Sequence, residues 1–425
     1  LARYGSANLT GSLKDGGARG ATGGRENHRL RNGLVVLQVA MALVLLVGAG
    51  LMFRSFQALR QVDPGFDPEG LLTARITVPE GEIEGSQETA LFFQQLQERL
   101  EAQPGAEGVA LIWRVPLSGS VGFTTVNLEV PPENLGNDYI VASPTAAGPG
   151  YFETMGIRLL EGRTFQLSDA ATGYRGAVVS ESFARRWWPQ GNALGSRLEG
   201  GGIIGFDWWE VVGVVADVHQ ASLDGEVEDM IYVPPMAGSR SDPRTMRTMD
   251  VVIKTDGPPL RFLPVLRREL RELNPRIPLA NPRTVEEIFD GATARTSFTM
   301  AILGSSAGIA LLIGLVGIYG VISYVVSLRT REIGVRMAVG ATAPSVRRMV
   351  MRQGAGLAVA GTAMGIIAAG VLSSLMRSLL FGISALDPLT YGGVVLVLVA
   401  VAVLASWLPA HRAATVDPSR ALRED

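Results

Sequence analysis

The sequence contains no cysteine, three histidines and two lysines among its 425 residues. Without cysteine the chain forms no disulfide and offers no thiolate to a substrate or a metal. The histidines, His28, His219 and His411, lack the spacing of a metal site. Neither Lys14 nor Lys254 lies in a GxxxxGK[ST] frame, so no nucleotide-binding phosphate loop is encoded. We therefore expect no metal site, no cofactor and no enzymatic activity in this chain.

Charged side chains are almost absent from four long apolar runs, and the mean hydropathy of the chain is +0.24. About 20 apolar residues suffice for a helix to cross a hydrocarbon core of roughly 30 Å. The runs predict transmembrane helices at residues 33–53, 299–326, 354–376 and 392–409. The expected fold is an α-helical membrane protein with four transmembrane helices and a large α+β extracytoplasmic domain, residues 54–298, between helices 1 and 2.

The region 54–298 mixes strand-like and helix-like stretches without another apolar run of spanning length. Leu71–Val78 and Trp208–Val218 predict strands, whereas Glu88–Glu101 and Pro259–Leu273 carry leucines at helical spacing. Shorter stretches predict further strands at 108–113, 124–130, 139–142 and 250–254, and a helix at 180–188. This order is typical of an α+β domain with a core of its own, and it also allows two subdomains.

Small residues recur within the apolar runs at a spacing that lets membrane helices approach closely. Gly304 with Gly308, and Gly361 with Gly365, form GxxxG pairs, which we expect to pack helices. A general abundance of glycine in membrane helices is the alternative explanation. Gly304–Gly308 also matches a G-x-S-x-G nucleophile elbow, but it lies within an apolar run and not at a strand-to-helix turn, which argues against a hydrolase.

The arginines indicate how the chain is oriented. Residues 327–353 carry Arg329, Arg331, Arg336, Arg347, Arg348 and Arg352 against one acid, Glu332. More arginines lie in 1–32 and 410–425, whereas 377–391 holds only Arg377 and Asp387. Short basic segments remain in the cytoplasm. We therefore expect both termini and the loop 327–353 to be cytoplasmic, with the loop 377–391 and the acidic domain 54–298 outside. The domain's acidic excess also excludes nucleic acid as a partner.

The loop 327–353 also has the pattern of two short helices. Residues 329–339 continue the second span, Gly340 and Ala341 break the helix, and Thr342 is suited to cap the next one, with Pro344 in its first turn. Val346, Met349 and Val350 share one face of that second helix. Such a helix fits a partner's groove or the membrane surface. The simpler alternative is that the arginines only set the topology.

The motifs of the chain resemble those of the MacB/FtsX-like ABC transporter permeases. Residues 331–341, REIGVRMAVGA, look like the family's signature after its second span, and 409–424 look like its P-A-x-R-A…D-P…A-L-R ending. Residues 38–51, 62–72, 149–157, 162–165 and 211–217 fit the same group. The resemblance implies a MacB-like periplasmic core domain at 54–298 and an FtsX-like permease domain at 299–425. Because residues 9–16 resemble the end of a preceding unit, the chain is also similar to the second half of an acidobacterial-type duplicated permease.

The resemblance implies that a separate cytoplasmic ABC ATPase moves the coupling loop, and with it the extracytoplasmic domain. The expected ATPase contacts are Arg331, Glu332, Gly334, Arg336, Ala338, Gly340, Ala341, Val346, Met349 and Val350. The expected partners are that ATPase, membrane lipid, a second permease unit (as a homodimer or the preceding half of a duplicated chain), and an outer-membrane or periplasmic protein. The implied role is mechanotransmission for efflux or extraction of an envelope substrate, at the bacterial plasma (inner) membrane. A non-transporting regulator of a cell-envelope enzyme, as in cell division, is the alternative.

Overall fold

The computed structural model describes residues 16–119, 122–130, 139–166, 169, 175–200, 206–235, 246–328, 330–339 and 342–414. The described chain forms two compact units. The first is helical and combines residues up to Arg60 with those from Thr296 onward, and the second comprises Gln61–Arg295. The predicted insertion of one large domain between the first and second spans is therefore confirmed.

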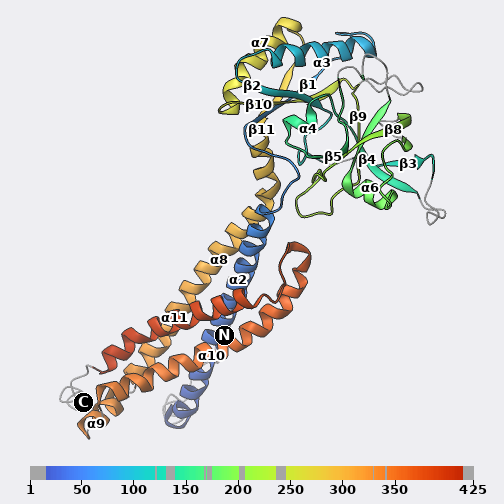
Figure 1. Ribbon diagram of the computed structural model, residues 1–425. Coiled ribbons are helices and arrows are strands. Elements are labelled where there is room, and N and C mark those ends of the chain that lie inside the picture. Colours follow the sequence, from blue (N-terminus) through green and yellow to red (C-terminus); the bar gives the residue numbers. More distant parts are fainter. Residues whose placement is uncertain are drawn as a thin grey trace, which may run out of the picture. The chain divides into compact units, whose positions relative to one another are not determined.

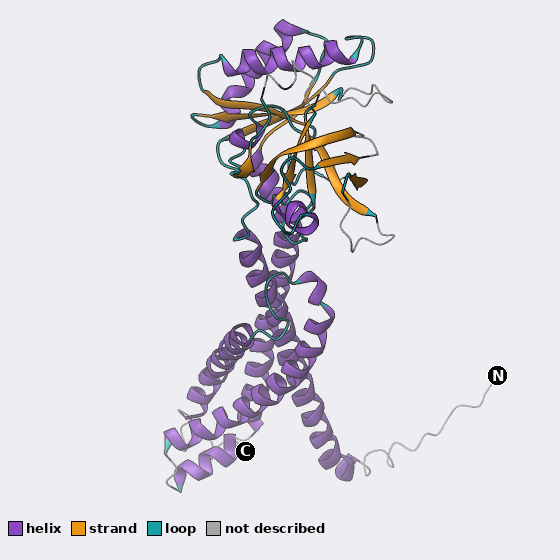
Figure 2. Ribbon diagram, turned by 45° about the vertical axis from the view of Figure 1, so that its right-hand side comes forward, coloured by secondary structure: helices purple, strands orange, loops and turns teal. Residues whose placement is uncertain are grey.

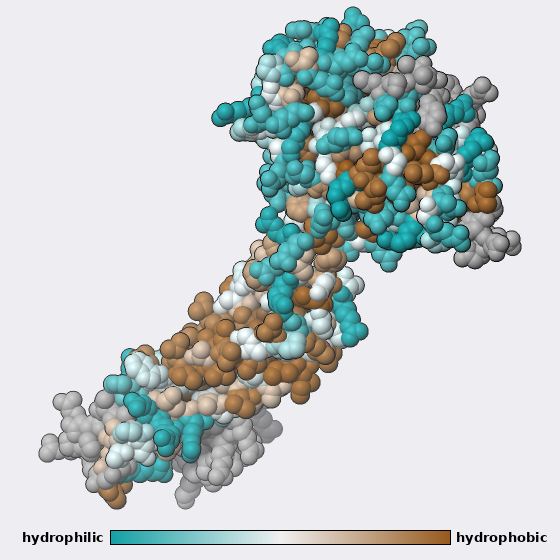
Figure 3. Space-filling model, in the orientation of Figure 1, coloured by the Kyte–Doolittle hydropathy of each residue, from teal (hydrophilic) through white to brown (hydrophobic). Residues whose placement is uncertain are grey.

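The helical unit is built from long apolar helices (Figure 1). They are α2 (Gly16–Arg60), the later part of α8 (Val285–Leu328), α10 (Ala343–Leu375) and α11 (Pro388–Ala414), with the short α9 (Thr330–Ala338) and η2 (Arg377–Leu379). Four segments are long and apolar enough to cross a membrane: Leu30–Arg60, Thr296–Leu328, Ala343–Leu375 and Pro388–Arg412. Three of them contain a predicted span, and the third, Ala343–Leu375, covers the predicted span 354–376 except for its last residue, Met376. Figure 3 shows their apolar side chains as a broad brown band over this unit.

Close contact between α10 and α2 depends on the second GxxxG pair. A Cβ at Gly361 would lie 2.6 Å from Val39 Cβ, and one at Gly365 would lie 2.9 Å from Leu43 Cβ. Both glycines are buried. Gly304 and Gly308 are different, because they are exposed and no described atom outside their own helix lies within 4 Å of an added Cβ. Of these two pairs, Gly361 and Gly365 lie at a contact between described helices, and Gly304 and Gly308 do not.

Polar contacts join α2 to the loop before α11. The Asp387 carboxylate pairs with Arg54, and it accepts hydrogen bonds from Thr390 N at 2.8 Å and Thr390 Oγ1 at 2.6 Å. Ser55 Oγ accepts a hydrogen bond from Phe381 N at 2.8 Å. A charge near the hydrocarbon core is costly unless it is paired. The Arg54–Asp387 pair therefore stabilises the contact between α2 and the loop before α11.

In the second unit, one sheet is antiparallel and covered by two helices (Figure 2). Its order is β11 (Leu279–Thr284), β1 (Leu71–Thr77), β10 (Thr248–Thr255) and β2 (Ala106–Ile112). The register pairs Leu71 with Lys254 and Asp250 with Ile112. Phe92, Leu96 and Leu100 of α3 (Ser86–Glu101), with Leu266 and Leu270 of α7 (Leu263–Leu273), pack on this sheet and build its core. η1 (Pro259–Phe262) leads into α7.

The other sheet is mixed and has seven strands. Its order is β5 (Leu159–Gly162), β8 (Phe206–Val215), β6 (Gly176–Ser180), β9 (Met230–Val233), β4 (Ile140–Ala146), β3 (Thr124–Leu128) and β7 (Arg197–Gly200). Because β7 also pairs with β8, all strands except β5 form a closed ring. Phe183 of α6 (Glu181–Trp187) and Trp209 of β8 belong to its core. The short α4 (Tyr151–Thr154) precedes β5.

All the predicted strands and helices of this domain are confirmed in kind, with ends that differ by a few residues. The predictions omitted β5, β6, β7, β9, β11 and α4. β6 and β9 are buried along their whole length, and β5 is exposed along its whole length, so none of them shows an alternating pattern. A four-residue segment such as α4 is too short for a helical period to emerge.

The first testable prediction concerns the helix contact at Gly361. Gly361→Leu forces a side chain against Val39 and the α2 backbone, and overpacking of this kind costs about 1–3 kcal/mol. Gly356→Leu is the matched control, since it lies on an exposed face of the same helix with no described atom near an added Cβ, and it should change stability by less than about 0.5 kcal/mol. Unfolding of the purified chain in mild detergent measures both. Equal destabilisation by the two variants would contradict the assigned contact.

The second prediction concerns Asp229, whose side chain is only 5% exposed and pairs with Arg186 at 2.9 Å. Burial raises the pKa of Asp229 above its ordinary 3.8, and the Arg186 charge only partly opposes this shift. The folded state thus binds the proton more tightly than the unfolded chain. The contribution of Asp229 to stability is therefore greatest below pH 3.8 and is lost as the pH rises through its folded-state pKa.

Asp229→Asn should therefore raise the melting temperature at pH 7, and this gain should vanish near pH 3. Asp224→Asn, at an exposed carboxylate, should have no effect at either pH. Tryptophan fluorescence during thermal unfolding at a series of pH values provides the measurement. A lower melting temperature for Asp229→Asn at pH 7 would show that the charged form stabilises the domain.

Candidate functional site

The short helix α9 has one face turned into the helical unit and one turned outward. Ile333 is 2% exposed, and with Met337 it packs on the core that includes Val35 and Ile318. Glu332, Val335, Arg336 and Val339 are exposed. They follow one another at i, i+3, i+4 and i+7, the spacing of a single helix face. We call these four residues the α9 outer face.

Charge and shape on this face are fixed by contacts of Arg336. Its guanidinium donates to Glu332 Oε1 at 2.6 Å and lies 3.2 Å from Met349 Sδ of α10. The first contact is an i, i+4 pair within α9, and the second joins α9 to α10. At half exposure such a pair is worth well under 1 kcal/mol, so its role here is to orient the two charges. Val335 and Val339 add an apolar patch, at 45% and 84% exposure.

The helix that follows is not a separate amphipathic segment. Thr342 stands at the N-cap of α10 with extended backbone angles, and Pro344 lies in the first turn, both as predicted. The Thr342 side chain, however, makes no capping hydrogen bond. α10 then runs without a break from Ala343 to Leu375, so the stretch expected to be a short coupling helix is the first part of the third span. Its continuity follows from the strong helix formers between Val346 and Gln353.

The apolar face of that stretch is already occupied. Val346 and Val350 are 3% and 6% exposed and lie in the same core as Ile333, while Met349 is half-buried against it. These side chains therefore hold α10 to the rest of the unit, and their apolar face is not open to a partner's groove. Val335 and Val339 are the exposed apolar residues that the sequence interpretation missed. The sequence did contain a signal for them, because Glu332, Val335, Arg336 and Val339 have the spacing of one helix face.

Other predicted contact residues are described in part. Arg331, Gly334 and Ala338 belong to α9, but only their backbone is described. Gly340 and Ala341, and the C-terminal motif from Thr415, lie outside the described residues. Near α9, the Arg31 guanidinium of α2 lies 4.0 Å from the Tyr324 ring centroid of α8, and Arg412 of α11 donates to Tyr319 Oη at 3.2 Å. Arginines thus tie three helices together at the end of the unit that carries α9.

The motifs of the second unit serve its own packing. Gly65, with φ +83°, lies so close to the carbonyl of Asp217 that a Cβ would overlap it. Arg163 N donates to Val212 O at 2.9 Å, and Asp67 N donates to Met155 O at 2.8 Å. The stretches 62–72, 149–157, 162–165 and 211–217 are therefore neighbours that fix one another. Tyr151 and Phe152 are fully buried and contact Tyr232, which makes this cluster a core.

Ionisable groups in this domain pair with charged neighbours. Burial raises the pKa of Asp169, but hydrogen bonds from Arg163 and from Gln166 N outweigh it, so the pKa lies below its usual value. The Arg163 guanidinium contacts both Asp169 oxygens, at 2.7 and 3.0 Å. Among the described residues, no group of three His, Asp or Glu side chains has the geometry of a metal site. Asp169 is thus held in a bidentate ion pair with Arg163.

Comparison with known proteins identifies both units. Residues 33–258 match the family model of the MacB-like periplasmic core domain, and residues 304–418 match that of the FtsX-like permease C-terminal domain. The periplasmic region of MacB from Actinobacillus actinomycetemcomitans covers 56% of this chain and 99% of its own, with 16% identity and a TM-score of 0.35.

Relatives differ in how much of their length they share with this chain. The "Uncharacterized ABC transporter permease YknZ" of Bacillus subtilis is 24% identical over 93% of this chain and 96% of its own. The "Macrolide export ATP-binding/permease protein MacB" of Marinobacter nauticus is 26% identical over 63% of this chain and 41% of its own. The "Pyoverdine export ATP-binding/permease protein PvdT" of Pseudomonas entomophila is 26% identical over 63% and 40%.

The chain thus spans about two fifths of the two export proteins and nearly all of YknZ. The first family model alone matches more than half of this chain, 33–258 of 425 residues. The four apolar helices and these relatives make it a multi-pass protein of the inner (plasma) membrane. The chain belongs to the MacB/FtsX-like family of ABC transporter permeases.

Proposed function

We propose that this chain couples ATP hydrolysis by a separate cytoplasmic ABC ATPase to movement of its domain 61–295. The observation that carries the proposal is the α9 outer face, an exposed charged and apolar surface on a helix whose other face is fixed to the spans. Arginine is enriched among the residues that dominate binding energy at protein interfaces, and the exposed Val335 and Val339 add apolar surface that a partner could bury. The α9 outer face lies within the sequence signature at 331–341 that suggested the coupling role.

Within the helical unit, packing contacts would transmit a displacement of α9 to the transmembrane helices. Ile333 and Met337 pack on the core that also holds Val346 and Val350 of α10. Arg336 adds a polar contact to Met349. Packed cores transmit displacement because they are dense and nearly incompressible. α2 and α8 are the two helices through which the chain enters and leaves the domain 61–295, so they carry the displacement onward.

We place α9 on the cytoplasmic side of the membrane because of the distribution of arginine. Arg31, Arg347, Arg348 and Arg412 lie at the end of the helices next to α9, whereas Arg54 at the other end is paired with Asp387. A short basic loop is retained in the cytoplasm. We infer that the domain 61–295 is extracytoplasmic and that both termini are cytoplasmic.

The proposed outcome of the movement is efflux or extraction of an envelope substrate. Two relatives are named for export, one of macrolides and one of pyoverdine, which supports export as the class of activity. The printed sequence holds no phosphate-loop motif, so we assign ATP hydrolysis to the partner. The alternative role, a non-transporting regulator of a cell-envelope enzyme, would use the same α9 outer face. It differs only in that the domain 61–295 would act on an enzyme and not on an exported substrate.

The third prediction tests the α9 outer face. Glu332→Lys with Val339→Asp reverses a charge and removes the more exposed residue of the apolar patch, and it should weaken binding of the cognate ATPase at least about tenfold, or about 1.4 kcal/mol. Stimulation of ATPase activity by the permease in proteoliposomes should fall in parallel. Glu129→Lys with Val130→Asp is the matched control, since Val130 is 80% exposed and Val339 84%.

The control should bind and stimulate the ATPase like the parent chain. If the α9 variant also behaves like the parent while remaining folded in the membrane, the coupling surface lies elsewhere. If both variants lose stimulation, the loss reflects charge reversal in general and the assignment to α9 fails.

We also propose that the exposed glycines of α8 contact a second permease unit. Gly304 and Gly308 have open space before them, and Ile302, Ile309 and Leu312 around them are 49–61% exposed. Small residues flanked by branched side chains allow helices of two chains to approach closely in lipid. Gly304 and Gly308 would then pack helices between two chains, as Gly361 and Gly365 pack helices within one chain.

The fourth prediction follows. Gly304→Leu with Gly308→Leu should lower the fraction of dimer severalfold, because bulk at both positions separates the helices. Energy transfer between labelled chains in proteoliposomes measures association. Gly356→Leu, at an exposed glycine of α10 with open space before it, is the control and should leave the dimer fraction unchanged. Undiminished energy transfer in the double variant would exclude this face.

A further inference from the structure

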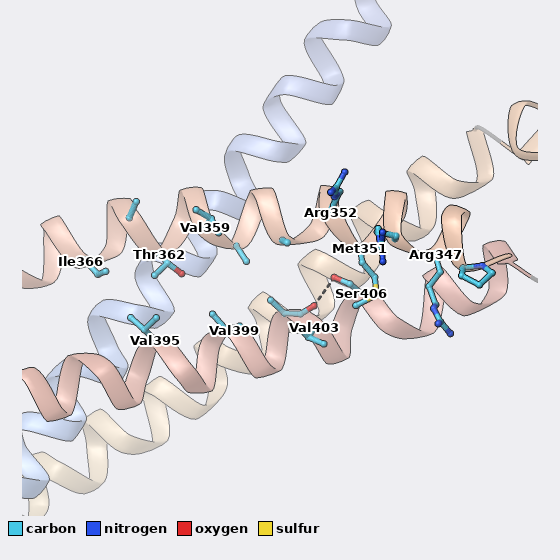
Figure 4. A pocket seen from close by; sticks show the side chains of 16 residues that line it. Arg347, Met351, Arg352, Val359, Thr362, Ile366, Val395, Val399, Val403 and Ser406 are labelled. Carbon is cyan, nitrogen blue, oxygen red and sulfur yellow. Dashed lines mark hydrogen bonds between the residues drawn. The ribbon is translucent and has the colours of Figure 1, made fainter. Parts of the chain in front are cut away.

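A groove runs along the surface of the helical unit between α10 and α11 (Figure 4). Its volume is about 670 Å³. Figure 4 shows Arg347, Arg352 and Met351 at one end of the groove, and Ile366 and Val395 at the other. The lining is apolar for most of its length and basic at one end only.

Small side chains make this surface hollow. Ala358 of α10 and Ala402 and Ser406 of α11 are 6%, 5% and 2% exposed and form the floor. Ser406 Oγ donates to Ala402 O at 2.7 Å, so its hydroxyl is satisfied within α11. Val359 and Val403 stand above the floor at 65% and 44% exposure. Apart from the hydroxyl of Thr362, the lining between the arginines and Ile366 therefore presents hydrocarbon.

At the basic end, no acid among the described side chains matches the arginines. Arg347, Arg348 and Arg352 line the groove and are exposed. In the helical unit, the acids whose side chains are described are Glu332 and Asp387, and each already pairs with another arginine. Three guanidinium groups therefore share one rim with no described carboxylate to neutralise them. Guanidinium groups bind phosphate oxygens well, through paired N–H donors.

The apolar part of the groove has the length of one leaflet. From Ala355 to Ile366 along α10, and from Val395 to Ser406 along α11, the rise is about 17 Å at 1.5 Å per residue. One leaflet contributes about half of a hydrocarbon core of roughly 30 Å. An acyl chain anchored at the arginines therefore reaches the far end of the groove without leaving its leaflet.

We propose that this groove is a binding site for one anionic phospholipid, with its acyl chain between α10 and α11 and its headgroup phosphate on Arg347, Arg348 and Arg352. The occupant is a lipid because the groove joins an apolar channel of acyl-chain length to a rim of three arginines that no described carboxylate neutralises. Basic pockets between spans on the cytoplasmic side favour anionic headgroups. Because the three arginines lie at the start of α10, the lipid would tie the segment after α9 to the membrane surface.

The site is tested on the full chain in mild detergent, with retention of added phosphatidylglycerol or phosphatidylcholine measured by native mass spectrometry. The parent chain should retain one phosphatidylglycerol, with an affinity about tenfold above that for phosphatidylcholine, equivalent to about 1.4 kcal/mol. The preference should shrink at high salt, since exposed charges are screened. Glycerol phosphate, which has the headgroup without the chain, should not compete.

Two kinds of variant separate headgroup from chain. Arg347→Gln with Arg348→Gln and Arg352→Gln should abolish the preference for phosphatidylglycerol, whereas Arg377→Gln, in η2 just beyond the opposite end of α10, should retain it. Ala363→Trp fills the groove and should lower retention of both lipids at least about fivefold, or about 1 kcal/mol. Ala368→Trp is the matched control, on an exposed face of α10 outside the groove, and should retain lipid like the parent.

The proposal is overturned if the triple variant keeps its lipid preference while melting like the parent. It is also overturned if Ala363→Trp retains lipid but loses the dimer, because the occupant would then be a helix of a second copy. Competition by glycerol phosphate would show a free phosphate site instead. None of these measurements requires the ATPase, so the result is independent of the coupling proposal.

Discussion

The structure depends most on the exclusion of unpaired charge from the hydrocarbon core. In the four spans, charged side chains gather near the helix ends. At one end Arg54 is neutralised by Asp387, and at the other several arginines contact tyrosines or remain exposed. A buried charge costs several kcal/mol in lipid, so this segregation determines how the helices can sit in the membrane. The proposed orientation, the proposed coupling surface and the lipid groove all depend on it.

The structure also depends on close helix packing, which buries the inner face of α9 against the spans. Gly361 and Gly365 allow α10 to approach the α2 backbone, and the resulting core receives Ile333 of α9 and Val346 of α10. A surface helix held in this way is positioned to move with the spans, as the coupling proposal requires. The outer face of α9 remains available, while the apolar face of the following stretch does not. The signature 331–341 therefore combines one anchoring face with one exposed face.

Sequence reasoning located the spans and the inserted domain because long apolar runs and leucines at helical spacing are strong signals. It could not distinguish Gly304 and Gly308 from Gly361 and Gly365, since the spacing is identical and only the neighbouring helix differs. It assigned Val346 and Val350 to a partner because an apolar helix face has the same pattern whether it enters a partner's groove or its own core. Short strands such as β7 and β9 depend on pairing with distant residues, which a local pattern does not report.

The most direct test of the central claim is the side of the membrane on which α9 lies. The chain has no cysteine, so single substitutions at Val339 and at Tyr139, which are 84% and 80% exposed, are its only labelling sites. A membrane-impermeant maleimide added to intact spheroplasts should label Tyr139→Cys, and it should label Val339→Cys only after lysis. Labelling of Val339→Cys in intact spheroplasts, or equal labelling of both, would contradict the account.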